Sequence, residues 1–92
     1  MKTIKDIKAE YEKHLDAKRA IADYTALIEA GCPQADEAYT ERGLLYWKLD
    51  MRAEAINDYN EAIRINPASR AVQVKEATYS ILDYYNKDLY NP

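Results

Sequence analysis

Residues 20–29 read AIADYTALIE, and residues 55–64 read AINDYNEAIR. The two stretches share five positions at a constant interval: Ala20, Ile21, Asp23, Tyr24 and Ile28 recur 35 residues later as Ala55, Ile56, Asp58, Tyr59 and Ile63. A fixed period near 35 residues is typical of repeat proteins. One such unit cannot bury its apolar face alone, so it must stack on a neighbour. The period therefore predicts a stack of similar units.

Apolar spacing and turn residues divide the chain into five predicted helices. Ile4, Ile7 and Tyr11, for example, fall on one helical stripe. The connections between the helices are short, which forces neighbouring helices to pack antiparallel. The helices are expected over about residues 2–14, 16–30, 34–49, 50–65 and 69–86. The last six residues, KDLYNP, are expected to form an irregular tail.

Residues that favour helix ends mark these boundaries. Asp16, Asp50 and Ser69 are predicted N-caps, because their side chains can accept hydrogen bonds from the N–H groups of a first helical turn. Gly31 is predicted at the left-handed position that closes the second helix, and Asn66 at the equivalent position after the fourth.

Charge and composition exclude several classes of function. The chain has 92 residues and a net charge of −3. Its only candidate basic stripe, Lys2, Lys5 and Lys8, is interrupted by Asp6 and Glu10, so nucleic-acid binding is not expected. The N-terminal stretch has no apolar segment of a signal peptide, and no apolar run approaches membrane-spanning length. A soluble, cytoplasmic protein without membrane contact is expected.

The sequence offers little for catalysis or metal binding. It contains one histidine, His14, and one cysteine, Cys32. A lone cysteine allows no internal disulfide, and a metal site needs several convergent ligands. No nucleophile, base and orienting group can be assembled, and no phosphate-binding loop is present. We expect a protein that is not an enzyme and that holds no metal or cofactor.

Residues 36–67, DEAYTERGLLYWKLDMRAEAINDYNEAIRINP, resemble a tetratricopeptide repeat. The signature of this family is a spaced set of packing residues, which here are Tyr39, Gly43, Tyr46, Leu49, Ala55, Tyr59, Ala62 and Pro67. In the family, the small residue at the place of Gly43 lies where the two helices of a repeat cross closely. The resemblance implies an all-α fold: a short solenoid of two antiparallel helix pairs plus a C-terminal capping helix.

The resemblance extends over one domain, residues 1–92, with varying strength. Residues 1–33 look like a degenerate first repeat, in which Lys8 stands where Gly43 stands in the second and must point away or widen the helix crossing. Residues 34–67 are the well-matched repeat. Residues 68–86 resemble a lone first helix, with Ala77 aligned to Gly43, and residues 87–92 are the tail. Such a terminal helix is expected to cap the array.

Proteins of this family usually bind a peptide or partner helix in a concave groove lined by the first helix of each pair. The resemblance therefore implies a non-catalytic adaptor whose partner is a protein or peptide. Leu44 and Trp47 would anchor the partner, although both could instead pack against the capping helix. Thr40 and Thr78 would offer hydrogen bonds, Lys5, Lys48 and Lys75 would attract acidic groups, and Ala9 would line the groove.

A second hypothesis is self-assembly, because stable arrays usually contain at least three repeats. The chain would form a homo-oligomer through its first helix or through the tail, where Tyr84, Tyr85 and Tyr90 cluster.

Two further expectations concern the core. Four tyrosines at packing positions should reach a partner or the surface with their hydroxyls: Tyr24, Tyr39, Tyr46 and Tyr59. Asp23 and Asp58, at equivalent places, are expected to form inter-helix hydrogen bonds or ion pairs, with Arg42 as a candidate partner.

Overall fold

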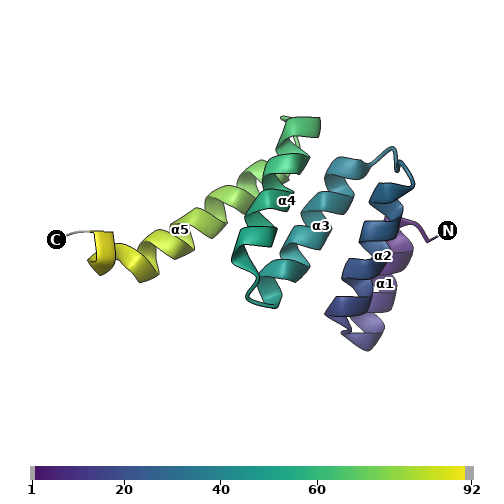
Figure 1. Cartoon of the computed structure of the whole chain (residues 1–92), viewed down its shortest axis with the longest axis horizontal. Coiled ribbons are helices and arrows are strands. Elements are labelled where there is room, and N and C mark those ends of the chain that lie inside the picture. The colour runs from purple at the N-terminus through teal and green to yellow at the C-terminus, as the bar shows by residue number, and fades with distance from the viewer. Residues whose placement is uncertain (1, 91–92) are drawn as a thin grey trace.

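The computed structural model describes the backbone of residues 2–90 and the side chains of residues 2–81. Five helices make up the described chain, which contains no strand: α1 (Ile4–His14), α2 (Ala17–Glu29), α3 (Ala35–Lys48), α4 (Arg52–Ile65) and α5 (Ala71–Tyr90). Consecutive helices run in opposite directions, so the α1–α2 turn and the α3–α4 turn lie at the same end of the molecule (Figure 1). The fold is the predicted all-α solenoid of two helix pairs followed by a fifth helix.

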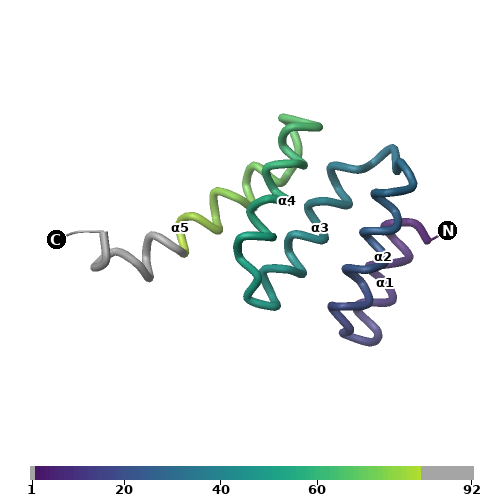
Figure 2. Tube along the Cα trace, viewed as in Figure 1, coloured from purple at the N-terminus to yellow at the C-terminus, as the bar shows by residue number. Residues whose placement is uncertain are grey.

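The chain path in Figure 2 shows that α3 lies between α2 and α4. It contacts α4 most extensively and α2 next, and it also contacts α5. No helix in the described part of the chain is long and apolar enough to span a bilayer.

Three of the predicted helix ends are confirmed. The Asp16 carboxylate accepts a hydrogen bond from the Arg19 N–H at 3.1 Å. Gly31 adopts a left-handed φ of 81°, which costs glycine nothing, and its N–H donates to the Ile28 carbonyl at 3.0 Å. The Ser69 hydroxyl accepts from the Ala71 N–H at 3.1 Å at the start of α5.

Three other expectations about helix ends are wrong. Asp50 does not cap α4: it lies in the left-handed region after α3 (φ 62°), and Met51 precedes α4 without a side-chain cap. Asn66 is not left-handed but extended (φ −142°, ψ 99°), because the ring of the following Pro67 restricts its backbone. The tail does not begin at residue 87, since α5 continues to Tyr90; residues 91–92 lie outside the described chain.

The α3–α4 pair is held at its crossing by Gly43. A methyl group at this position would lie 2.6 Å from Cε1 of Tyr59 and 3.2 Å from the Ala55 carbonyl oxygen. Ala55 and Tyr59 are themselves completely buried. The predicted close crossing is therefore confirmed, and only a residue without a side chain allows it.

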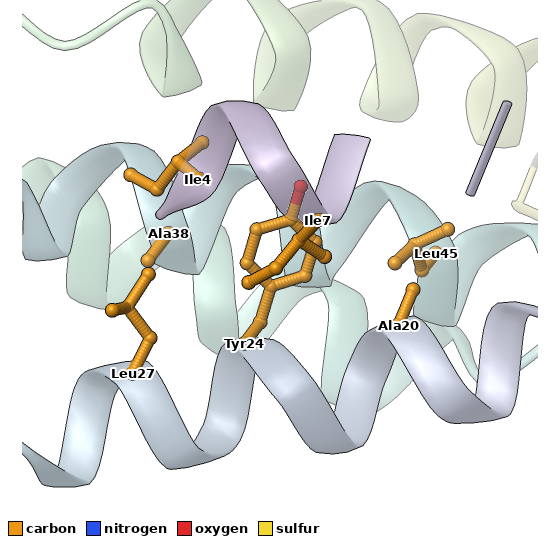
Figure 3. Close-up of a cluster of buried hydrophobic side chains, with 7 residues drawn as sticks. All are labelled: Ile4, Ile7, Ala20, Tyr24, Leu27, Ala38 and Leu45. Carbon is orange, nitrogen blue, oxygen red and sulfur yellow. The ribbon is translucent and has the colours of Figure 1, made fainter. Parts of the chain in front are cut away.

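A separate apolar cluster joins α1, α2 and α3. Tyr24 of α2 lies at its centre, 1% exposed, with Ile7 of α1 against its ring (Figure 3). Ala38 and Leu45 contribute from α3. Since α3 takes part in both this cluster and the one around Tyr59, it connects the two repeats.

The α1–α2 pair is looser than the α3–α4 pair, which contact each other far more extensively. Lys8 occupies the place of Gly43 in α1, as the sequence indicated. Its side chain reaches α3, where Nζ lies 3.5 Å from Oε1 of Glu41. This contact and the smaller α1–α2 interface are compatible with either of the two expected alternatives.

Asp23 and Asp58, at equivalent places of the repeats, both form ion pairs; the predicted inter-helix contact is confirmed for Asp58, whereas the partner of Asp23 precedes α1. Arg42 donates two hydrogen bonds to the Asp58 carboxylate, at 2.8 and 2.7 Å, and a third to the Thr25 hydroxyl of α2 at 3.1 Å. Asp23 pairs with Lys2 at 3.0 Å. Arg42 therefore ties α3 to both α4 and α2.

The expectation for tyrosine hydroxyls fails at Tyr59. This hydroxyl is buried and makes no hydrogen bond of acceptable geometry among the described residues. Burial raises the pKa of Tyr59, and the neighbouring Thr78 hydroxyl offsets only part of this effect. The side chains of Tyr84, Tyr85 and Tyr90 lie outside the described part of the chain.

The outer face of α5 is mixed over the residues whose side chains are described. Gln73 and Glu76 are exposed, but so are Tyr79 (43%) and Ile81 (46%), whereas Ala71 and Thr78 are buried. A helix with one covered and one solvated face can end a solenoid, which is the role expected of a capping helix.

Candidate functional site

A groove lies between α1 and α3. It consists of two pockets that share Lys8 and Glu12 of α1, and we call them the apolar pocket and the polar pocket. Both helices start at one end of the groove, so the polar pocket lies near their N-termini and the apolar pocket near their C-termini. The two pockets together form one continuous surface.

The apolar pocket has a volume of about 370 Å³. Its walls are the side chains of Tyr11, Tyr24, Leu44, Leu45 and Trp47. Charged residues stand around its rim, namely Lys8, Glu12, Glu41 and Lys48. Burial in an apolar wall next to carboxylates raises the pKa of the Tyr24 hydroxyl, so this group remains neutral.

The polar pocket is larger, about 660 Å³. Lys5, Lys8, Ala9 and Glu12 line it from α1, together with Ile4. The opposite wall is the beginning of α3, with Gln34, Asp36 and Glu37. This half of the groove therefore offers charged and hydrogen-bonding groups of both signs.

Five of the eight residues expected to contact a partner line this groove. Leu44, Trp47 and Lys48 belong to the apolar pocket, and Lys5 and Ala9 to the polar pocket. Leu44 and Trp47 also pack partly against the cluster around Tyr59, which includes Ala71 of α5. Their role as anchors for a partner stays a prediction.

The other three expected residues are placed differently. Thr40 is fully buried, and its hydroxyl donates to the Asp36 carbonyl at 2.8 Å. Thr78 is 5% exposed and faces the core. Neither hydroxyl is free for a partner, contrary to the expectation. Lys75 lies over the ring of Tyr79, 5.7 Å from its centre, and lines neither pocket.

Two of the three aromatic rings of the apolar pocket lie next to a cation. Lys48 Nζ lies 5.1 Å from the centre of the Tyr11 ring and 3.3 Å from its hydroxyl. The Arg52 guanidinium lies 5.3 Å from the centre of the Trp47 ring and pairs with Asp50 at 3.1 Å. Such contacts favour one orientation of each ring.

A chain of ion pairs crosses the concave side of the molecule. Glu41, on α3, is bound by Lys8 from α1 and by Arg70 from the start of α5. Arg70 also binds Glu37 at 2.8 Å. The three helices α1, α3 and α5 are thereby linked through one carboxylate.

Sequence reasoning missed Tyr11, Tyr24 and Lys8 as groove residues. The sequence predicts that Tyr11 and Tyr24 pack against neighbouring helices; they do so, and both also line the apolar pocket. Lys8 was noted only as a poor match to the repeat pattern. That mismatch was the available signal, because a lysine cannot remain inside a close helix crossing.

The single histidine, His14, and the single cysteine, Cys32, lie outside the groove and line neither pocket. Among the described residues, no three His, Cys, Asp or Glu side chains converge in a way that could hold a metal ion. What the groove offers is shape, apolar surface and charge, which are properties of a binding surface.

Comparisons with known proteins agree with the helical-repeat fold. The family model for the tetratricopeptide repeat matches residues 36–69, and the chain belongs to the tetratricopeptide repeat family. It is similar to a Bacteroides fragilis protein, BF1650, whose solution NMR structure superposes with a TM-score of 0.82 at 36% sequence identity. The match covers 99% of this chain and 91% of the other. A comparison with curated proteins gave no match. Members of this family generally serve as protein–protein interaction modules.

Proposed function

We propose that this chain is a non-catalytic adaptor that binds a segment of a partner protein in the groove between α1 and α3. The observation that carries the proposal is the apolar pocket, in which Leu44 and Trp47 offer partly exposed apolar surface beside a second, polar pocket. Partly exposed aromatic and aliphatic side chains in a recess are typical of interface hot spots.

The length of the groove limits the size of the segment. The 11 residues of α1 extend over about 16 Å. An extended peptide advances about 3.3 Å per residue, so roughly five of its residues would fit. A large apolar side chain of the segment would enter the apolar pocket, and its polar residues would lie along the polar pocket. Lys5, Ala9 and Lys48 would contact the segment at the rim.

The test uses peptides selected against the folded protein from a random display library. Trp47 is the only tryptophan, so its fluorescence reports directly on the apolar pocket. Selected peptides should change Trp47 emission and should lose affinity at least tenfold for Leu44→Glu, because a carboxylate would enter the pocket. Leu15→Glu makes the same chemical change on a side chain that is 71% exposed and lies outside both pockets. It should bind like the wild type.

Two outcomes would contradict the proposal. If no peptide is selected, or if Leu44→Glu and Leu15→Glu bind equally well, the groove is not the binding surface. Circular dichroism of both variants shows whether they retain the helix content of the wild type.

A second candidate function is self-assembly, favoured by apolar side chains at one end of the molecule. Leu15 follows α1 and is 71% exposed, and Leu49 and Met51 in the α3–α4 turn are 36% and 39% exposed. Both turns lie at the same end (Figure 1). Light scattering on a sizing column distinguishes the two functions: an oligomer that dissociates in Leu15→Glu supports self-assembly, and a monomeric wild type excludes it.

A further inference from the structure

The position of Lys8 bears on how the proposed groove is used. It is one of two residues shared by both pockets, and its ammonium group reaches across the groove to Glu41 on the opposite wall. The ion pair therefore stands between the apolar and polar pockets. A segment that occupies only one pocket can leave it intact, whereas a segment that continues through both must pass the point where it closes.

The two partners of this ion pair are held very differently. The Glu41 side chain is 14% exposed and is also bound by Arg70, so it is fixed from the side of α5. The Lys8 side chain is 49% exposed, and its 3.5 Å separation from Glu41 is long for a charge-assisted hydrogen bond. Opening the contact requires only Lys8 to move into solvent, because Arg70 continues to compensate the Glu41 carboxylate.

We propose that the Lys8–Glu41 ion pair is a strap across the groove, which opens when a partner segment occupies both pockets. This inference rests on the proposed groove function. The segment it requires has a large apolar side chain for the apolar pocket, joined directly to polar residues for the polar pocket. Lys8 lowers the affinity for that segment because its ammonium group must first leave Glu41.

The size of the effect follows from the exposure of the pair. Exposed ion pairs contribute little and are weakened by salt. Removing the strap should therefore raise the affinity for a long segment by about two- to five-fold, the range expected for an exposed pair. The affinity for a short segment confined to the apolar pocket should not change.

The experiment compares Lys8→Gln with Lys13→Gln, a matched control on the same helix whose exposed side chain lines neither pocket. Each variant is titrated with a selected peptide long enough for both pockets and with its truncated half that carries only the apolar anchor. Lys8→Gln should strengthen binding of the long peptide alone, and Lys13→Gln should bind both peptides like the wild type. Raising NaCl from about 0.05 to about 0.5 M should bring wild type and Lys8→Gln together.

Unchanged or weaker binding of the long peptide by Lys8→Gln would overturn the strap, while a failure of all peptides to bind would overturn the groove function itself. The strap is also tested without any peptide. In the NMR spectrum of the free protein at low salt, the side-chain protons of Lys8 and Glu41 should show a nuclear Overhauser effect that weakens as NaCl is added. Its absence at low salt contradicts the proposal even if the groove binds peptides.

Discussion

Replacing Gly43 with alanine tests the claim that the α3–α4 crossing depends on one missing side chain. The new methyl carbon would lie 2.6 and 2.9 Å from two carbons of the Tyr59 ring and 3.2 Å from the Ala55 carbonyl oxygen. Carbon atoms in contact normally stay about 3.5–4.0 Å apart. The two helices must therefore separate by about 1 Å, or the ring must move, and the ring is completely buried.

Two opposing effects set the magnitude for Gly43→Ala. Overpacking a well-packed core costs about 1–3 kcal/mol. Alanine in place of glycine inside a helix returns about 0.5–1 kcal/mol, because it restricts the unfolded chain. The midpoints of the two ranges give a fall of about 1.2 kcal/mol in the free energy of unfolding, and the extremes give a fall of about 0 to 2.5 kcal/mol. For a domain of this size each kcal/mol lowers Tm by about 4–8 °C, so the midpoint corresponds to a fall in Tm of roughly 5–10 °C.

The assay is urea unfolding followed by circular dichroism, with Tyr59→Leu as the second arm of a double-mutant cycle. Tyr59→Leu removes the ring that the methyl group meets, so Gly43→Ala should cost much less in that background. The reasoning is refuted if Gly43→Ala is as stable as the wild type, or if its cost is the same with and without the Tyr59 ring.

Three further predictions concern single groups of the fold. Tyr59→Phe removes a buried hydroxyl that has no hydrogen-bond partner among the described residues, so urea unfolding should show unchanged or slightly increased stability. A fall of more than about 1 kcal/mol in the free energy of unfolding would mean that the hydroxyl is hydrogen-bonded. Arg42→Met leaves the Asp58 carboxylate, 6% exposed, without its partner and should cost about 3–5 kcal/mol near neutral pH. Burial already raises the pKa of Asp58, and losing Arg42 raises it further, so the charged form is disfavoured in the folded variant. The loss of stability caused by Arg42→Met should therefore shrink as pH falls toward 4. Urea unfolding at several pH values measures this change. Hydrogen bonds with Thr3 hold the pKa of Asp6 below its ordinary value. The stability that this cap provides is therefore present above about pH 4 and is lost as pH falls through the folded-state pKa. In Asp6→Asn, the free energy of unfolding should depend less on pH in this acidic range.

Local chemistry made much of the fold predictable. The Asp16 cap and the left-handed Gly31 depend on a few neighbouring residues, and both are observed. The Gly43 crossing was also predictable, because the repeat pattern places a small residue opposite Tyr59. The prediction for Asp50 is wrong because a residue in a short turn between two helices can either end the first helix or cap the second. Asp50 adopts the left-handed conformation that ends α3, and Met51 is the N-cap residue of α4.

The candidate site was less predictable, because groove residues are defined by how closely neighbouring helices approach. Helix position alone placed Thr40 and Leu44 on one groove-facing stripe. In the folded chain Thr40 is covered completely, while Leu44 keeps an exposed edge in the apolar pocket. No pattern within α3 distinguishes the two, since the difference is made by the helices packed against it.

Lys8 affects both the packing of the first repeat and the lining of the groove. At the equivalent position of the second repeat, Gly43 allows α4 to close on α3, and that crossing buries Tyr59 completely. A lysine cannot be buried there without a partner, so α1 packs less extensively on α2 and the side chain turns toward α3. The same substitution that weakens the first repeat as a packing unit thereby places a charge in the groove. A large charged residue at this position of a repeat therefore has two linked effects. The helix pair packs less closely, and the charged group lies in the groove where a partner would bind.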